Sequence, residues 1–257
     1  MLKILITGAT GNLGRQVVRL LLGRQHRVRA YTQVANPSIP QDVEVYTGDL
    51  RAGSGLAEAT RGVDAIIHTA TAFEPGYVTE LQGARHLLDA AAENGVPHLL
   101  YISIAGVEES KFSYFKAKLE VEKMVTQSSV PWTILRATQF HTFPLQFITS
   151  GEDEQAGTIT LPMGMSFQSI EMSEVALGLA KLAEGSAAGY APVMGGPQIL
   201  TLEEMAESYA RHSNKQRVIR TEPLQGEIYD GFRGGVNLAP TRMVGHVTWE
   251  EFLQRRA

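Results

Sequence analysis

Tyr114 and Lys118 stand four positions apart in residues 113–126, a stretch whose pattern predicts a helix. Side chains at this spacing share one face of a helix and can reach the same ligand. An ordinary tyrosine has a pKa of about 10, and a neighbouring ammonium favours the phenolate and lowers that pKa. The pair is therefore suited to giving a proton to a carbonyl oxygen, or taking one from an alcohol, near neutral pH.

Ser103 ends the predicted strand at residues 98–103. Ligands of an open parallel sheet bind beyond the carboxyl ends of its strands, so we expect Ser103 to approach the same ligand as Tyr114 and Lys118. Its hydroxyl can hold a carbonyl oxygen by a hydrogen bond. Each residue alone has an ordinary alternative: the Tyr–Lys spacing arises by chance, the lysine can be solvated, and the serine can bond its own backbone. The combination favours a catalytic interpretation.

A glycine-rich turn joins the first predicted strand to the first predicted helix. The small residues Gly8, Gly11 and Gly14 let the backbone turn sharply and approach a diphosphate, and the helix N-terminus offers it free N–H groups. The alternative is a tight turn without a ligand. The position of the turn, between a strand and a helix of an alternating pattern, favours dinucleotide binding. The predicted phosphate-binding residues are Gly8, Thr10, Gly11, Asn12, Leu13 and Gly14.

The end of the second predicted strand bears on the choice of dinucleotide. Thr32 and Gln33 stand where NAD-binding sites often carry an acid that bonds the ribose 2′-hydroxyl. The absence of an acid, together with Arg15 after the third glycine, favours NADP(H) slightly over NAD(H), although Arg15 can equally be a solvated helix residue. Asp49 and Leu50 follow the third strand, and we expect them to contact the adenine.

Short apolar runs alternate with longer helical patterns in the first half of the chain. Apolar strands separated by helices predict an α/β fold with a Rossmann-type, doubly wound parallel sheet over residues 1–150. A small C-terminal substrate-binding or lid region is expected over 151–257. Predicted strands are residues 2–6, 26–32, 43–46, 65–69, 98–103 and 132–136, and predicted helices are 12–22, 55–59, 76–94 and 113–126. Later helices begin near Ser173, Thr201 and Thr248, the last two with capping-box spacing to Glu204 and Glu251.

The bulk properties exclude several classes of function. A net charge of -4 argues against nucleic acid as the main partner. The absence of cysteine excludes disulfides and thiolate metal sites, and the histidines show no paired ligand spacing, so no metal is expected. Neither a signal peptide nor an apolar run long enough to span a membrane is evident. We expect a cytoplasmic monomer or homodimer that acts on a small molecule.

Four segments together resemble the short-chain dehydrogenase/reductase superfamily, and within it the atypical NmrA-like, NAD(P)-binding branch. They are the glycine-rich turn and residues 101–103, 114–118 and 135–140. The resemblance implies a sheet of about seven parallel strands, a Lys118 that bonds the nicotinamide ribose, and a segment Thr138 to Phe140 beside the nicotinamide. Members of the branch often carry an arginine in place of Gln33. Several regulatory members lack the tyrosine found here at position 114, so its presence favours an enzyme.

Loops at one edge of the sheet are expected to form the rest of the site. Phe73 follows the fourth strand, and Phe140, His141 and Phe143 follow the sixth, so they can wall an apolar pocket over the nicotinamide. His141 could add a second proton donor, although a structural role is the commoner outcome. Further cofactor contacts are expected from Thr69, Ala70 and Thr71.

The leading hypothesis is an NAD(P)H-dependent oxidoreductase that transfers hydride to a small, mostly apolar carbonyl, enone or quinone-like substrate, with Tyr114 as proton donor. One alternative is an NAD(P)-sensing regulator without turnover, against which the retained Tyr114 counts. Another is a sugar-nucleotide epimerase or dehydratase that keeps its NAD, a class that generally has a longer C-terminal part than residues 151–257 provide.

Overall fold

The computed structural model describes residues 1–214 and 216–256, and it divides into two compact units. Unit 1 consists of Met1–Ser103, Ala117–Leu135 and Val175–Ala191, and unit 2 of Ile104–Lys116, Arg136–Glu174 and Pro192–Ala257. The units interleave along the chain, whereas the sequence prediction drew one boundary after residue 150. The assignment of one region to the cofactor and the other to the substrate stays a prediction.

The seven-stranded central sheet confirms the predicted α/β, Rossmann-type fold. Its strand order is β10-β6-β5-β4-β1-β2-β3, and β1 pairs in parallel with both β2 and β4. The order reverses direction at β1, which is typical of a doubly wound sheet. The strands are β1 (Lys3–Thr7), β2 (Arg27–Thr32), β3 (Glu44–Thr47), β4 (Ala65–His68), β5 (Leu99–Ile104), β6 (Trp132–Ala137) and β10 (Gly189–Tyr190).

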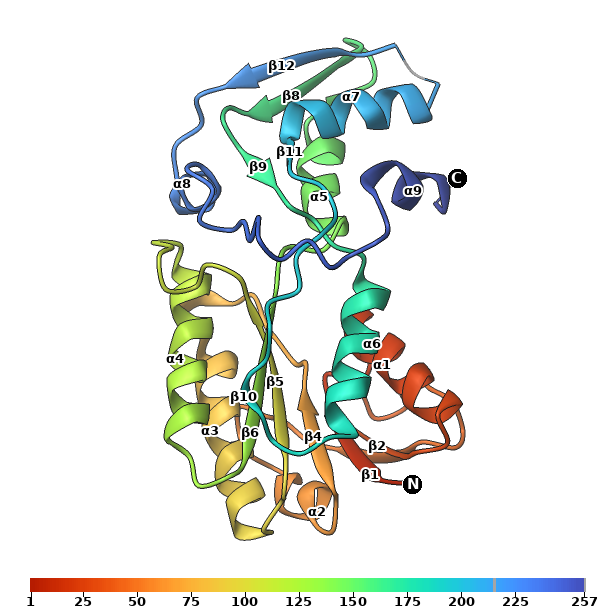
Figure 1. Cartoon of the computed structure of the whole chain (residues 1–257), viewed down its shortest axis with the longest axis vertical. Helices are drawn as coiled ribbons and strands as arrows, with labels where there is room; N and C mark the ends of the chain where they lie inside the picture. The colour runs from red at the N-terminus through yellow and green to blue at the C-terminus, as the bar shows by residue number, and fades with distance from the viewer. Residues whose placement is uncertain (215, 257) are drawn as a thin grey trace. The chain divides into compact units, whose positions relative to one another are not determined.

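Helices cover both faces of this sheet, which explains why β4 is buried at every residue. The helices α1 (Asn12–Gly23) and α6 (Met172–Ala183) lie on one face, and α3 (Val78–Glu93) and α4 (Ser113–Gln127) lie on the other (Figure 1). A turn of 3-10 helix, η1 (Pro75–Tyr77), precedes α3. The short helix α2 (Leu56–Thr60) packs against α3. The core under α3 and α4 includes Leu5, Ile66, Leu87, Leu99 and Val121.

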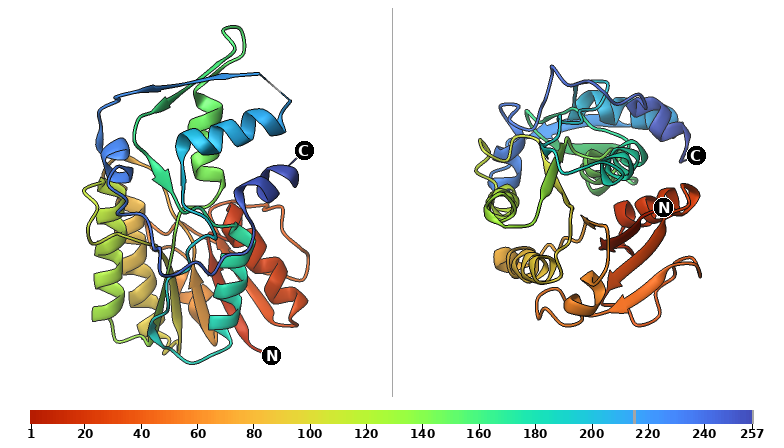
Figure 2. Two further views of the ribbon diagram at one scale, coloured as in Figure 1. Left: turned by 45° about the horizontal axis from the view of Figure 1, so that its top comes forward. Right: turned by 60° about the horizontal axis from the view of Figure 1, so that its bottom comes forward.

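Hydrogen bonds between charged or polar side chains connect the end of α6 to the residues that follow α1. Glu184 accepts a hydrogen bond from Arg24 Nε at 2.7 Å and one from His26 Nε2 at 2.8 Å. Figure 2 shows α1 in red and α6 in teal as neighbours. These contacts join segments about 160 residues apart in sequence and hold α6 to unit 1.

The described part of unit 2 includes two small sheets and several helices of its own. The strands β7 (Glu152–Asp153), β8 (Thr158–Pro162) and β12 (Val218–Glu222) form one sheet, and β9 (Ser166–Phe167) pairs with β11 (Leu200–Thr201). The helices are α5 (Thr142–Ser150), α7 (Leu202–His212), α8 (Glu227–Phe232) and α9 (Trp249–Gln254). The predicted capping boxes are confirmed: Thr201 and Glu204 cap α7, and Thr248 and Glu251 cap α9. In the described ranges no helix is long and apolar enough to cross a membrane.

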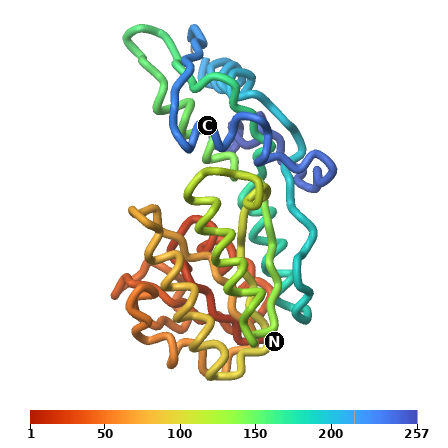
Figure 3. Tube along the Cα trace, turned by 90° about the vertical axis from the view of Figure 1, so that its left-hand side faces the viewer, coloured from red at the N-terminus to blue at the C-terminus, as the bar shows by residue number. Residues whose placement is uncertain are grey.

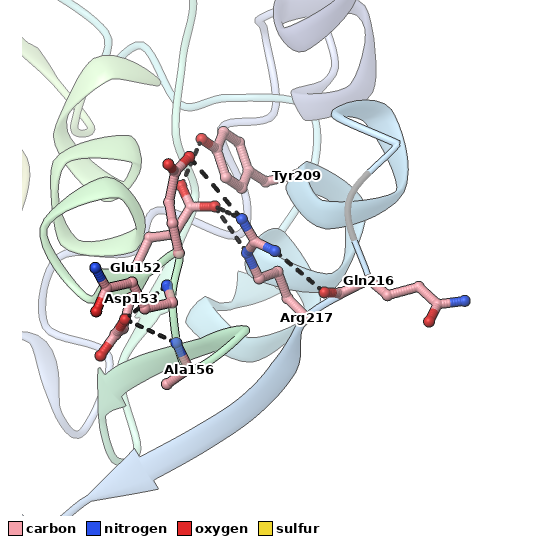
Figure 4. A network of polar contacts seen from close by, with 8 residues as sticks. Glu152, Asp153, Ala156, Tyr209, Gln216 and Arg217 are labelled. Carbon is pink, nitrogen blue, oxygen red and sulfur yellow. Dashed lines mark hydrogen bonds and ion pairs between the residues drawn. The ribbon is translucent and has the colours of Figure 1, made fainter.

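A largely buried ion pair joins β7 to the segment before β12 (Figure 4). Glu152 receives hydrogen-bonding contacts from Arg217 Nε and Nη2, both at 2.9 Å, and from the Tyr209 hydroxyl at 3.2 Å. Only 11% of the Arg217 side chain and 9% of the Glu152 side chain are exposed. The pair therefore connects two strands of one sheet and one helix, α7.

Replacing Arg217 with alanine should lower the free energy of unfolding by about 3 kcal/mol, because it leaves the buried Glu152 carboxylate without its cation. Urea unfolding measures this change. The control is Arg211→Ala, which removes a largely exposed arginine of α7 and should change stability by less than about 0.5 kcal/mol. Equal stability of the Arg217→Ala protein and the wild type would contradict the structural role of the pair.

Candidate cofactor and active site

The glycine-rich turn follows β1 directly. Gly8 has a φ of +73°, and a Cβ on it would lie 2.7 Å from backbone atoms of Ala70. A Cβ on Gly14 would lie 2.1 Å from the carbonyl oxygen of Gly8. Glycine is therefore required at both positions for the turn itself to close. At Gly11 a Cβ would meet only the Gly8 oxygen, at 3.2 Å, so the fold alone demands less of this residue.

The N-terminus of α1 is open to an anion. Gly11 is the N-cap residue, no side chain of the described residues caps the helix, and its first turn contains no acid. The first N–H groups of a helix have no partner within it, and they carry partial positive charge. The turn and this helix end fit the diphosphate of a dinucleotide, as the sequence predicts.

The predicted adenine-side residues lie close together. Thr10 and Thr32 approach through their hydroxyls at 3.5 Å, and Gln33 Nε2 donates to Asp49 Oδ1 at 2.7 Å. Asp49 also accepts from the Arg51 backbone N–H at 2.9 Å, while Leu50 is buried in the core beside α3. The exposed Arg15 lies in α1. The cofactor roles of these residues stay predictions.

The predicted residues that follow β4 are held by their neighbours in unit 1. Thr69 Oγ1 donates to the Thr7 carbonyl at 2.8 Å, which links the ends of β4 and β1. Thr71 Oγ1 donates to Glu80 Oε2 at 2.8 Å. With Ala70 against Gly8, these residues put the β4 end beside the glycine-rich turn, where a dinucleotide would bind.

Ser103 lies on β5, one residue before the strand ends, and is 2% exposed. Within the described ranges its buried Oγ has no hydrogen-bond partner. A buried hydroxyl left without a partner costs about 1–3 kcal/mol, so the structure retains a polar group that a ligand oxygen would satisfy. This is the chemistry predicted for Ser103 at a carbonyl oxygen.

Lys118 is buried on α4 and its ammonium is paired with a carboxylate. Its Nζ donates to Glu80 Oε1 at 2.9 Å and lies 4.5 Å from the centroid of the Tyr101 ring. Tyr101 donates its hydroxyl to the same Glu80 oxygen at 3.1 Å. Glu80 comes from α3 and Tyr101 from β5, so three elements converge on one carboxylate.

In this cluster the negative charge of Glu80 offsets the positive charge of Lys118. Burial alone would raise the pKa of Glu80, but Lys118 and His68, together with the hydrogen bonds that Glu80 accepts, outweigh burial and hold the pKa below its usual value. Burial lowers the pKa of His68 to about 4, so its imidazole is neutral at pH 7. His68 Nδ1 and the Thr7 hydroxyl form a hydrogen bond of 2.6 Å. The His68 ring stacks on the Tyr101 ring with centroids 5.5 Å apart.

Sequence analysis missed Glu80, Tyr101 and His68 as site residues. Glu80 had a usable signal, because it falls on the buried stripe of α3 that includes Ala84, Leu87 and Ala91. A lone acid in an apolar helical stripe must find a partner inside the protein. His68 at the end of β4 and Tyr101 within β5 carried a weaker signal, since polar aromatic residues in strands are commonly satisfied core residues.

Tyr114 lies one turn before Lys118 on α4, as predicted, and is 8% exposed. Its ring packs edge-on against Phe112 of unit 2 with centroids 6.2 Å apart. Tyr114 belongs to unit 2, whereas Lys118 and Ser103 belong to unit 1. The joint action of these three side chains therefore stays a prediction.

The predicted pocket residues fall in different surroundings. Phe73 is 71% exposed in the loop after β4. His141 is buried, and both ring nitrogens contact protein groups: Nε2 donates to the Val247 carbonyl at 3.1 Å, and Nδ1 faces the Ser169 hydroxyl at 2.7 Å. Burial lowers the pKa of His141, which agrees with a neutral structural histidine. The surroundings of His141 favour the structural alternative.

Phe143 does not lie in a loop, as the sequence analysis expected, but in α5. Its neighbour Pro144 is at the third helical position, where a missing N–H costs no hydrogen bond, so the proline does not prevent the helix. The Phe143 ring lies 5.2 Å from Phe232 and packs into an aromatic cluster of unit 2. Phe140 lies just before this helix, partly exposed.

Comparison with known proteins agrees with the cofactor-binding features. A family model described as NAD(P)H-binding matches residues 8–184. A photosystem II assembly factor of Cyanophora paradoxa is 29% identical over 147 residues, 54% of this chain and 46% of that protein, so the match spans about half of that relative. The (4-alkanoyl-5-oxo-2,5-dihydrofuran-3-yl)methyl phosphate reductase of Streptomyces griseus is 30% identical over 221 residues, 81% of this chain and 73% of that protein.

Solved structures share the fold. The crystal structure of the NADPH-dependent quinone oxidoreductase of Escherichia coli, in complex with NADPH, superposes with a TM-score of 0.83. The two chains are 21% identical, and the superposition covers 98% of this chain and 99% of that one.

Proposed function

Because this chain belongs to the NAD(P)H-binding family, within the atypical, NmrA-like short-chain dehydrogenases/reductases, we propose that it is a nicotinamide-dependent reductase. Its substrate is a small, mostly apolar carbonyl, enone or quinone-like molecule, and Tyr114 is the proton donor. The observation that carries the proposal is the buried ammonium of Lys118, held one helical turn after Tyr114.

When bound, the nicotinamide supplies the hydride. The N–H groups at the start of α1 hold the diphosphate, and the Ser103 hydroxyl donates a hydrogen bond to the substrate oxygen. Tyr114 gives its phenolic proton to that oxygen as negative charge develops on it. The Lys118 ammonium stabilises the resulting phenolate, which regains a proton from water.

A reductase screen tests this proposal. The purified protein is mixed with NADPH or NADH and a panel of quinones, enones and simple carbonyl compounds, and cofactor oxidation is followed by absorbance. Turnover of at least one class supports the proposal. Cofactor binding without oxidation across the panel would contradict it and favour the non-catalytic, nucleotide-sensing alternative.

We propose NADP(H) as the preferred cofactor, with Arg15 as a contact of the 2′-phosphate. The exposed Arg15 stands in the first turns of α1, close in sequence to the predicted diphosphate site. No acid ends β2, and the Asp49 carboxylate nearby is engaged by Gln33 Nε2 and the Arg51 N–H, which compensate part of its charge. A guanidinium can bind a phosphate through paired hydrogen bonds.

Arg15→Ala should raise the Kd for NADPH about tenfold and leave the Kd for NADH unchanged, because only the former carries the phosphate that Arg15 would bind. Fluorescence titration of both cofactors measures the two constants. The matched control is Arg19→Ala, which removes an exposed arginine one turn further along α1. Equal weakening of NADPH by both variants would show only a loss of general positive charge and would count against the specific contact.

A further inference from the structure

The Glu80–Lys118 ion pair lies in the interior of the protein, out of contact with most of the solvent. The Glu80 side chain is 0% exposed and the Lys118 side chain 5% exposed. Their helices, α3 and α4, lie side by side, as Figure 3 shows in orange-yellow and yellow-green. Charges removed from water to this extent persist only where each has a close partner and further hydrogen bonds.

Glu80 meets this condition almost completely. Its Oε1 accepts from Lys118 at 2.9 Å and from the Tyr101 hydroxyl at 3.1 Å, and its Oε2 accepts from Thr71 at 2.8 Å. The carboxylate is thus held from three directions by α4, β5 and the loop after β4. It sets both the position and the direction of one N–H of the ammonium.

The other titratable groups around Lys118 do not replace this carboxylate. From β4 comes His68, neutral at pH 7, and from β5 comes Tyr101, whose ring lies under the ammonium. On α4 itself, Tyr114 stands one turn before Lys118 and Glu122 one turn after, and Glu122 accepts from the Tyr190 hydroxyl at 3.3 Å. Glu80 contacts the ammonium directly, with its Oε1 2.9 Å from Lys118 Nζ.

We propose that Glu80 is a positioning residue of the reductase: it keeps Lys118 charged in the buried interior and fixes the ammonium one turn from Tyr114. The inference rests on the proposed function, and it adds to it a residue that touches neither substrate nor cofactor.

Glu80→Gln keeps the size of the side chain and removes its charge. The buried ammonium then loses the neighbouring charge of Glu80, and desolvation is expected to lower the pKa of Lys118. If Lys118 stays charged instead, its uncompensated charge lowers the pKa of Tyr114. Either change makes the coupled Tyr–Lys system lose a proton at lower pH. The direction of this pH shift therefore does not depend on which of the two groups loses the proton.

The experiment measures two quantities in the full chain. The first is the alkaline limb of the kcat–pH profile, where the coupled Tyr114–Lys118 pair loses its first proton; in Glu80→Gln it should move to lower pH by about one unit, a tenfold change in proton affinity. The second is the titration midpoint of Lys118, followed by NMR of 13C-labelled lysine and assigned with Lys118→Met. It should fall in the same direction.

The matched control is Tyr101→Phe. This change removes a hydrogen bond to the same Glu80 oxygen and keeps both charges and the aromatic ring. Both the alkaline limb and the Lys118 midpoint should move much less than in Glu80→Gln, because the carboxylate charge beside the ammonium is kept. If the control moves them as far as Glu80→Gln does, the effect comes from a disturbed core, and the inference is overturned.

The Lys118 midpoint decides the inference without turnover. A protein that reduces no substrate but shows the lower midpoint in Glu80→Gln loses the proposed reductase function and keeps the role of Glu80 in holding Lys118 charged. A working reductase whose limb and midpoint are unchanged in Glu80→Gln overturns the inference alone. Should Glu80→Gln fail to fold, Glu80→Asp takes its place, because it lengthens the contact with Lys118; an unchanged midpoint in that variant is equally decisive against the inference.

Discussion

Tyr114→Phe is expected to lower kcat by about 10²–10⁴-fold, because it removes the positioned proton donor. The Kd for the cofactor should stay unchanged, since the diphosphate is proposed to bind at the glycine-rich turn and the start of α1, away from this substitution. The phenylalanine ring can keep the edge-on contact with Phe112, so the fold should be retained. Steady-state kinetics with the best substrate of the reductase screen, together with fluorescence titration of NADPH, measure both quantities.

The control is Tyr209→Phe. It also deletes one phenolic hydroxyl, which donates to Glu152 in unit 2, and it should leave kcat unchanged. Wild-type turnover by the Tyr114→Phe protein would remove Tyr114 as the proton donor. A parallel loss of kcat and cofactor affinity would show that the substitution disturbs the site as a whole.

Gly11→Val is expected to raise the Kd for NADPH at least about 100-fold. Gly11 has φ -74° and ψ 169°, an extended conformation that valine adopts readily. Its Cβ would meet only the Gly8 oxygen at 3.2 Å, so the turn can retain its shape. The branched side chain would then stand over the first N–H groups of α1, where the diphosphate has to approach.

Gly23→Ala is the matched control on the same helix. A Cβ there meets nothing within 4 Å, so cofactor affinity and stability should both be retained. Gly14→Ala would be a poor test, because its Cβ would lie 2.1 Å from the Gly8 oxygen and disturb the turn itself. Tight NADPH binding by a folded Gly11→Val protein would contradict the proposed position of the diphosphate.

Local patterns in the sequence predict most of the central sheet. The strands β1 to β6 begin and end within a residue or two of their expected positions. Strands buried on both faces, such as β1 and β4, are short apolar runs between turn residues, whereas β3 is a mostly exposed edge strand. The capping boxes of α7 and α9 are equally local. By contrast, β10 has only two residues, and its pairing with β6 bridges about 55 positions, so no local pattern indicates it.

The site is predictable only where a motif is local. The glycine-rich turn and the Tyr114–Lys118 spacing are short-range patterns, and the structure keeps both. The partner of Lys118 is 38 positions away on another helix, and no spacing rule relates the two. The partners of His141, which are 28 and 106 positions away, explain in the same way why its structural surroundings are not readable from the sequence.

The three separate segments of unit 1 also determine at what stage of synthesis the unit can be completed. Its sheet and one of its covering helices need Val175–Ala191, which the ribosome makes only after Arg136–Glu174 of unit 2. A nascent chain of 150 residues thus has neither α6 nor β10, and the apolar surface that α6 covers in the finished protein is still bare. For the same reason, an excised fragment ending at residue 150 does not contain the whole of unit 1, because Val175–Ala191 is encoded beyond the cut.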